Sequence, residues 1–202
     1  MKHAILIALG VILLTGLIFL VIPADQDIHI EDAPWVVVPQ GDRVKTLGIV
    51  LGRDVFQSVV DNLGEPEGIA AFRDDDGDFS SLEVYYGTVN AGGVRGKMIL
   101  NLEVPADVSS MIEESSNAKR TNVGTHKLLF DEYHLGFPRQ QTVVAISYAP
   151  SYRGFTEELI IQWYGEPESR VPEKDGEYWF YPEKHLDLTW DGSSRIFLEF
   201  KK

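Results

Sequence analysis

The segment with the most recognisable chemical pattern is "RDDDGDFSS", in which three carboxylates, Asp74, Asp76 and Asp78, alternate along the chain. The first half of a calcium-binding loop alternates its ligands in the same way, but such a loop requires Gly at its sixth position and Glu at its twelfth. Counted from Asp74, those positions hold Phe79 and Tyr85, so the signature fails. We interpret the segment as a solvated turn before a strand, with a loose cation site as the alternative.

Other residue types that bind metals or attack substrates are scattered along the chain. The five histidines have no metal-binding spacing and there is no cysteine, so only a pair such as His126 and His134 could converge across a turn. No Gly-x-Ser-x-Gly elbow is present. We therefore expect no metal ion, no cofactor and no enzymatic activity. The five histidines are His3, His29, His126, His134 and His185.

A glycine-rich stretch, "AGGVRG", contains Gly92, Gly93 and Gly96. A phosphate-binding loop is followed by a helix, whose N-terminal amides hold the anion. Here a strand pattern follows the glycines, so the stretch predicts a hairpin turn.

Four consecutive aromatic residues are the candidate partner-binding site: Tyr178, Trp179, Phe180 and Tyr181. Side chains of a strand alternate between the two faces of a sheet, so one pair is expected in the core and the other on the outer face. The outward pair is either Tyr178 with Phe180 or Trp179 with Tyr181. An exposed row of aromatic side chains is typical of a contact surface. Either residues 105–141 fold over this face or a partner covers it.

The elements that position these residues follow from a repeated tetrapeptide, Gly-Glu-Pro-Glu, which begins at Gly64 and again at Gly165. Before the first copy, apolar residues recur at helical spacing, and Asp54 with Gln57 predicts a capping box. We expect Gly64 to end that helix in a left-handed conformation, with Pro66 preventing its continuation. The apolar face comprises Phe56, Val59, Val60 and Leu63.

The second copy ends a second helix in the same way, with Thr156 as its N-cap and Pro167 after Gly165. Each helix is followed by an aromatic run and further strands, which predicts an α+β fold of two similar units of helix plus antiparallel strands. We place the first unit at residues 43–104, a connecting segment at 105–141 and the second unit at 142–202. The predicted strands include "LEVYYG", "GKMILNLEV", "TVVAISY", "EYWFYP" and a hairpin in "HLDLTWDGSSRIFLEF". The connecting segment is expected to hold a short helix from Asp107 and a strand or covering loop at "HKLLFDEYHLG".

The N-terminal residues 4–22 carry no charge over nineteen positions, enough for a helix of roughly 28 Å that spans a bilayer core. A cleaved signal peptide is the alternative, but the run is long and Ile22-Pro23-Ala24 is a poor cleavage site. Lys2 precedes the span and acidic residues follow it, so we expect the N-terminus in the cytoplasm. The predicted protein is a single-pass inner (cytoplasmic) membrane protein with its C-terminal domain in the periplasm or outside the cell.

The exported part is strongly acidic. The 18 basic residues less Lys2 leave 17 against 31 acidic residues from position 23 onward, a net charge of −14. Such a field repels nucleic acid, so no nucleic-acid partner is expected. Residues 23–42 are acidic and proline-rich and are interpreted as a tether, in which "PWVVVP" could form a short extended edge segment.

A helix that ends in Gly-x-Pro and is followed by an antiparallel meander resembles the tandem-repeat fold of β-lactamase-inhibitor proteins and of SmpA/OmlA-type outer-membrane-assembly lipoproteins. Residues 47–67 and 155–168 carry the resemblance, which covers about half of the exported chain. It implies a binding or scaffold protein of the bacterial envelope rather than an enzyme. The lipoproteins' acylated Cys is absent here, replaced by the predicted membrane segment.

These observations together favour a membrane-anchored envelope protein that binds another envelope protein or stabilises an assembly. An enzyme or small-ligand receptor with a site in the cleft between the two units is the alternative. An inhibitor of an extracytoplasmic enzyme is a third possibility.

Overall fold

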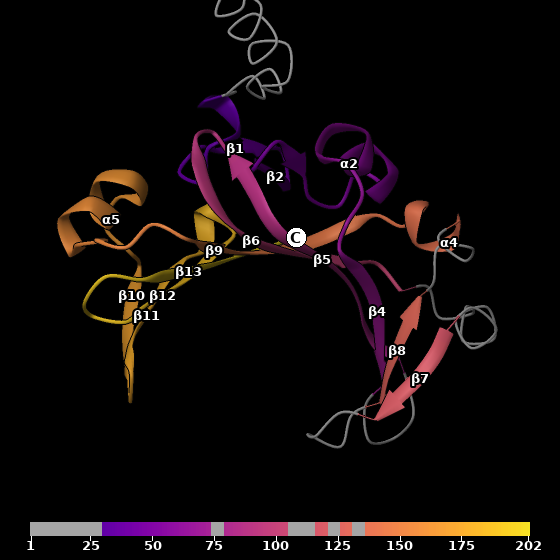
Figure 1. Cartoon of the computed structure of the whole chain (residues 1–202). Helices are drawn as coiled ribbons and strands as arrows, with labels where there is room; N and C mark the ends of the chain where they lie inside the picture. Colours follow the sequence, from indigo (N-terminus) through magenta and orange to yellow (C-terminus); the bar gives the residue numbers. More distant parts are fainter. Residues whose placement is uncertain (1–29, 74–78, 105–115, 121–125, 131–135) are drawn as a thin grey trace, which may run out of the picture.

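The computed structural model of the chain describes residues 30–73, 79–104, 116–120, 126–130 and 136–202 (Figure 1). The predicted membrane span at residues 4–22, the carboxylates Asp74, Asp76 and Asp78, and the start of the helix expected at Asp107 all lie outside these residues. Among the described helices, none has the length and apolar character needed to cross a bilayer.

One ten-stranded sheet dominates the described chain, and every neighbouring pair of strands in it is antiparallel. The order across the sheet is β10-β11-β12-β13-β9-β6-β5-β4-β8-β7. The fold is therefore α+β and rich in sheet, as the sequence predicts at that level. The strands are β4 (Gly68–Arg73), β5 (Phe79–Ala91), β6 (Val94–Leu102), β7 (Ser116–Arg120), β8 (His126–Phe130), β9 (Val143–Pro150), β10 (Ser169–Glu173), β11 (Gly176–Tyr181), β12 (Leu186–Trp190) and β13 (Ile196–Lys201).

The two halves of the sheet join where β6 pairs with β9 from Gly96 opposite Pro150 to Leu102 opposite Val143. Two predicted turns are confirmed on either side of this junction. Gly92 and Gly93 form the two-residue β5–β6 turn, both with positive φ. The turn between β12 and β13 is closed by Asp191, whose Oδ1 accepts hydrogen bonds from three backbone amides, those of Ser193, Ser194 and Arg195.

One face of the sheet forms the core. The side chains on it are opposite one another in register from strand to strand, for example Trp179 with Leu188 and Tyr148 with Met98. Because strand side chains alternate, the same alternation in every strand brings all of these residues to one side. The row Trp179, Leu188, Leu198, Tyr148, Met98 and Tyr86 is at most 4% exposed throughout.

Helices α2 (Phe56–Leu63) and α5 (Glu157–Tyr164) cover this core face, together with a small sheet of β1 (Val37–Gln40), β2 (Arg43–Thr46) and β3 (Ile49–Val50). Short helical segments complete the chain: η1 (Ile30–Asp32), α4 (Gly136–Arg139) and η3 (Pro182–Lys184). Figure 1 shows the large sheet as an arch, with these elements outside it and both ends bending away from them. The inner side of the arch is the opposite face of the sheet.

The two long helices end in the same conformation. Gly64 has φ 83° and ψ −172°, and Gly165 has φ 80° and ψ −173°. The predicted positive φ is confirmed, but ψ is close to 180° rather than left-handed helical, a region that is essentially restricted to glycine. A tyrosine hydroxyl then donates to each glycine carbonyl, from Tyr86 to Gly64 at 3.0 Å and from Tyr181 to Gly165 at 3.1 Å.

The predicted N-cap of α5 is confirmed, and that of α2 is wrong. Thr156 Oγ1 accepts a hydrogen bond from Leu159 N at 3.3 Å. In α2 the N-cap is Val55, which makes no side-chain cap, because Asp54 Oδ2 instead accepts from Val50 N at 2.8 Å in the preceding turn. Gln57 donates to Asp61 on the next helical turn.

Part of the predicted tether, residues 23–42, belongs to the folded domain from Ile30 onward. The aromatic ring of Trp35 lies 4.5 Å from that of Trp163, and the Tyr164 hydroxyl donates to the carbonyl of Pro34 at 2.9 Å. The expected edge segment is confirmed, since β1 pairs only with β2 in the small sheet. The fold therefore begins before Arg43, because burial of this segment against α5 outweighs its proline-rich, acidic composition.

The connecting segment contributes β7, β8 and α4. Strand β8 pairs with β4, and β7 forms the edge of the sheet, at the end opposite to β10 and β11. The described part of residues 105–141 therefore extends the sheet sideways and does not cover the strand of the four aromatic residues.

Candidate functional site: the inner face of the arched sheet

The four aromatic residues of β11 are divided between the two faces of the sheet. Tyr178 and Phe180 lie on the inner face of the arch, both partly exposed, with stacked rings whose centroids are 6.3 Å apart. Trp179 and Tyr181 lie in the core, at 0% and 4% exposed. The structure thus decides which pair is outward, and direct contact with a partner remains a prediction only for Tyr178 and Phe180.

Trp179 and Tyr181 have structural partners instead. Trp179 Nε1 donates to Glu177 at 2.8 Å, and the Arg170 guanidinium lies 4.1 Å above its ring. Burial raises the pKa of Tyr181 to about 12, which keeps its hydroxyl protonated as the donor to Gly165. Trp179 contacts Arg170 of β10, and Tyr181 bonds to Gly165 at the end of α5. The prediction that these two residues contact a partner is therefore wrong, because both side chains are buried in the core.

An apolar patch extends from Tyr178 and Phe180 over the neighbouring strands. Val171 is opposite Tyr178 in β10, and Thr189 lies between Tyr178 and Phe197 in register. Val171 is 48% exposed and Phe197 is 41% exposed. The sequence analysis missed both residues, although the alternation that places Ile196, Leu198 and Phe200 in the core places Phe197 on the other face.

A charged group lies beside this patch. Lys201 Nζ is 2.9 Å from Asp187 Oδ2 and 2.9 Å from Glu199 Oε2. Hydrogen bonds to Asp187 and Glu199 raise the pKa of Lys201, so the group holds two carboxylates and one ammonium and has a net charge of −1. All three side chains are partly exposed on the inner face, at 30%, 35% and 51% for Asp187, Glu199 and Lys201.

The other half of the inner face contributes Tyr85 from β5 and Ile99 from β6, which are opposite each other in register. Tyr85 is 37% exposed. It precedes Tyr86 as Phe180 precedes Tyr181, and Tyr86 and Tyr181 are the two residues that bond to the helix-ending glycines. Corresponding positions in the two halves of the chain therefore place one aromatic side chain each on the inner face.

We name this surface the open face and define it as the inner-face side chains of β10–β13, β9, β6 and β5. In Figure 1 the described helices and the small sheet all lie on the other side of the arch. Within the described residues, the open face is therefore not covered by another layer. A half-exposed apolar sheet surface beside a charged group is typical of a contact surface.

The part of the chain that the structure describes contains no group of three or more His, Cys, Asp or Glu side chains arranged to hold a metal ion. His185 has a left-handed conformation at the end of η3, and its Nδ1 lies 3.1 Å from the Lys201 carbonyl. A cavity among the described residues is a second candidate place for a ligand.

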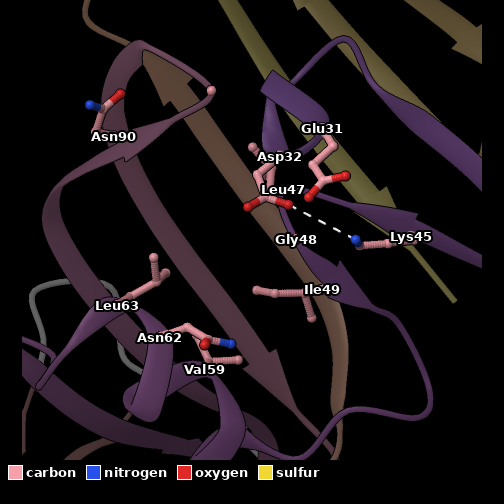
Figure 2. A pocket seen from close by; sticks show the side chains of 11 residues that line it. Glu31, Asp32, Lys45, Leu47, Gly48, Ile49, Val59, Asn62, Leu63 and Asn90 are labelled. Atoms are coloured by element: carbon pink, nitrogen blue, oxygen red, sulfur yellow. Dashed lines mark ion pairs between the residues drawn. The ribbon is translucent and has the colours of Figure 1, made fainter. Parts of the chain in front are cut away.

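The cavity has a volume of about 520 Å³ and lies between η1, the β2–β3 turn, α2 and the tip of the β5–β6 hairpin. Figure 2 shows Glu31 and Asp32 on one wall, facing Asn62 and Leu63 of α2. The ammonium group of Lys45 is 4.0 Å from Asp32. All the lining residues belong to the N-terminal segment and the first half of the chain, so this cavity is not in the cleft expected between two units. None of them is a Ser, Thr, Cys or His nucleophile or base.

Comparison of the chain with protein-family models, with curated proteins and with solved structures finds no match.

Proposed function

We propose that this chain is a membrane-anchored envelope protein that binds another protein through the open face and acts as a binding or scaffold module. The observation that carries the proposal is the position of Tyr178 and Phe180. Their rings stack on each other at the surface of a sheet whose other face is fully occupied by the core. A sheet with apolar residues on both faces is stabilised when a further layer covers the second face.

The proposed anchor is the uncharged segment at residues 4–22, with the folded domain outside the cytoplasm. Seven residues, 23–29, separate this segment from Ile30, where η1 begins. Eight Cα–Cα steps reach at most about 28 Å, so the domain would lie close to the bilayer. In Figure 1 the chain enters on the outer side of the arch, which would direct the open face away from the membrane.

The proposed architecture is a tandem repeat of the kind that β-lactamase-inhibitor proteins and SmpA/OmlA-type proteins contain. Three correspondences support it: the shared conformation of Gly64 and Gly165, the tyrosine bonds to their carbonyls, and an ion pair of each following glutamate with an arginine. Glu65 pairs with Arg139, and Glu166 pairs with Arg170. The resemblance implies a binding or scaffold protein of the bacterial envelope, which is consistent with the proposed function.

The anchor and the binding face are tested separately. For the anchor, a reporter enzyme that is active only outside the cytoplasm is fused after Lys202, and the membranes are washed with alkaline carbonate. We expect an active reporter and retention of the chain in the membrane pellet. Recovery of a soluble form that begins near Asp25 would disprove the anchor and leave export intact.

For the binding face, the full chain is purified from its own membranes with and without the paired substitutions Tyr178→Ala and Phe180→Ala. We expect the variant to lose a co-purifying protein that the wild type retains. The matched control is Val38→Ala, since Val38 is 43% exposed on β1, outside the open face. Equal loss in the control, or no loss in the variant, would contradict the proposal.

A small-ligand receptor is the second candidate function, because the cavity of about 520 Å³ is large enough for a small molecule. Its polar wall of Glu31 and Asp32 would favour a ligand with a cationic group. Loss of the function after Glu31→Gln, with Tyr178 and Phe180 unchanged, would favour this candidate over the first.

A further inference from the structure

We propose that the partner of the open face is an α-helix of about 16 residues that lies across the strands, with apolar side chains near both ends and a basic side chain in the middle. This inference rests on the proposed function and specifies the partner of the same site. It follows from the order of side chains along one row of the sheet.

The row runs perpendicular to the strands from Phe180 to Tyr85. Each residue is opposite the next in register, in the order Phe180, Asp187, Glu199, Ser147, Ile99 and Tyr85. The row therefore has an aromatic side chain at each end and two carboxylates between them. Five steps between neighbouring strands cover about 24 Å along the sheet, because paired strands are 4.7–4.9 Å apart.

A helix matches this row better than other protein elements. A helix rises 1.5 Å per residue, so about 16 residues cover 24 Å, and the backbone groups away from its two ends are already hydrogen-bonded within the helix. An extended peptide would instead pair with a sheet edge. Among the described strands, β10 forms the edge of the sheet nearest to Tyr178 and Phe180, and it contains Pro172, which cannot donate a hydrogen bond there.

A second copy of this chain is a poor occupant. In a two-fold symmetric contact between two open faces, the acidic group around Asp187 and Glu199 would lie near its own copy. Each chain also carries a net charge of −13, which adds repulsion between copies. The arch gives a further reason, since two concave faces touch mainly at their rims (Figure 1).

The charges and sizes of the side chains define where the helix approaches most closely. Strand β9 contributes Ser147 to the middle of the row, where it is 9% exposed, and the small side chains of Ala145 and Ala149 lie on either side of it on the same face. Beside them, Lys201 neutralises only one of the two carboxylates of Asp187 and Glu199. A Lys or Arg at the centre of the partner helix would pair with the remaining charge as the helix displaces water.

The test uses a photo-crosslinking amino acid, p-benzoylphenylalanine, at position 180 or at position 85 of the full chain in its own membranes. We expect both positions to crosslink to one partner protein, at two sites separated by about 16 residues with a Lys or Arg between them. The same amino acid at position 38, on β1, is the control and should not crosslink to that segment.

Several results would overturn the inference. Adducts to a second copy, to another part of this chain, or to two unrelated proteins would each exclude a single bridging helix. Sites separated by about seven residues would indicate an extended peptide, which rises about 3.3 Å per residue. The absence of any adduct from positions 180 and 85 would exclude the open face as a binding site, whereas the reporter fusion described above would still report on the anchor.

The charge requirement is tested in the same crosslinking assay. We expect the paired substitutions Asp187→Asn and Glu199→Gln to lower the yield from positions 180 and 85 by about tenfold, the effect of losing one desolvated charge pair. The matched control neutralises two exposed acids outside both the open face and the cavity, Asp42→Asn and Glu183→Gln. An equal reduction of the crosslinking yield in the control, or an unchanged yield in the variant, would show that the partner helix has no basic side chain that pairs with Asp187 and Glu199.

Discussion

The conformation of the two helix-ending glycines allows a quantitative prediction. Gly64 and Gly165 have φ near 80° and ψ near −173°, a region in which a side chain costs of order 1–3 kcal/mol. A Cβ atom added at either position would meet no other atom within 4 Å, so no steric clash contributes. Replacing Gly by Ala also lowers the conformational entropy of the unfolded chain, which stabilises the folded state by about 0.4–1 kcal/mol. We therefore expect Gly64→Ala and Gly165→Ala each to lower the free energy of unfolding by about 1 kcal/mol, the difference between these two opposing terms.

The assay is guanidinium denaturation of the purified full chain, followed by tryptophan fluorescence. Trp179 is fully buried, so its emission reports on the core that both helices cover. The matched control is Gly68→Ala, four residues after Gly64, where a Cβ atom also meets nothing within 4 Å but φ is not positive. This control should leave the stability unchanged or raise it by up to about 1 kcal/mol.

The reasoning would be refuted if Gly64→Ala and Gly165→Ala behaved like Gly68→Ala within experimental error. The repeated tetrapeptide would then not depend on the backbone conformation of its first residue. A large effect at only one of the two glycines would show that the two helix ends are not energetically equivalent, despite their common geometry.

The remaining predictions concern single side chains. Trp179→Ala should lower the free energy of unfolding by about 3–5 kcal/mol in the same denaturation assay, whereas Phe180→Ala should change it far less; equal losses would show that both rings are buried. Tyr164→Phe should cost about 1 kcal/mol by removing the buried hydrogen bond to Pro34, and an unchanged midpoint would contradict that bond. Three backbone amides lower the pKa of Asp191, so its stabilisation is present above the unfolded pKa of about 3.9 and is lost as the pH falls toward the lower folded value. The stability difference between wild type and Asp191→Ala should therefore shrink between pH 7 and pH 2, and a constant difference would exclude the ionised carboxylate as its cause.

Local patterns in the sequence predict most of the individual elements. Helix periodicity before Gly64 and Gly165, the alternation of β12 and β13, and the glycine pair at 92 and 93 all correspond to observed helices, strands and turns. These features depend on interactions between residues a few positions apart, and such interactions can be read directly from the order of residue types. The N-cap of α2 is an exception, because Asp54 is used by a neighbouring turn.

Only the tertiary structure decided which side of β11 faces the core. All four residues from Tyr178 to Tyr181 are aromatic, so both faces of this strand are equally hydrophobic and the sequence does not show which face is buried. The position of α5 does distinguish them, because Tyr181 bonds to Gly165 and packs on Tyr164, which leaves Tyr178 and Phe180 on the open face. Packing between segments far apart in the chain, rather than the strand's own pattern, thus selected the exposed pair.

Long-range pairing also determined the start of the domain and the row of side chains across the sheet. Pro34 and Trp35 join the fold through contacts with α5, about 130 residues later in the chain. The row from Phe180 to Tyr85 exists only because β9 pairs with both β13 and β6. The sequence by itself determined which residues are apolar, where the chain turns and where its helices end, since these are local properties. The strand order and the surface that it creates depend on which distant segments bury one another, and that was decided by the tertiary structure alone.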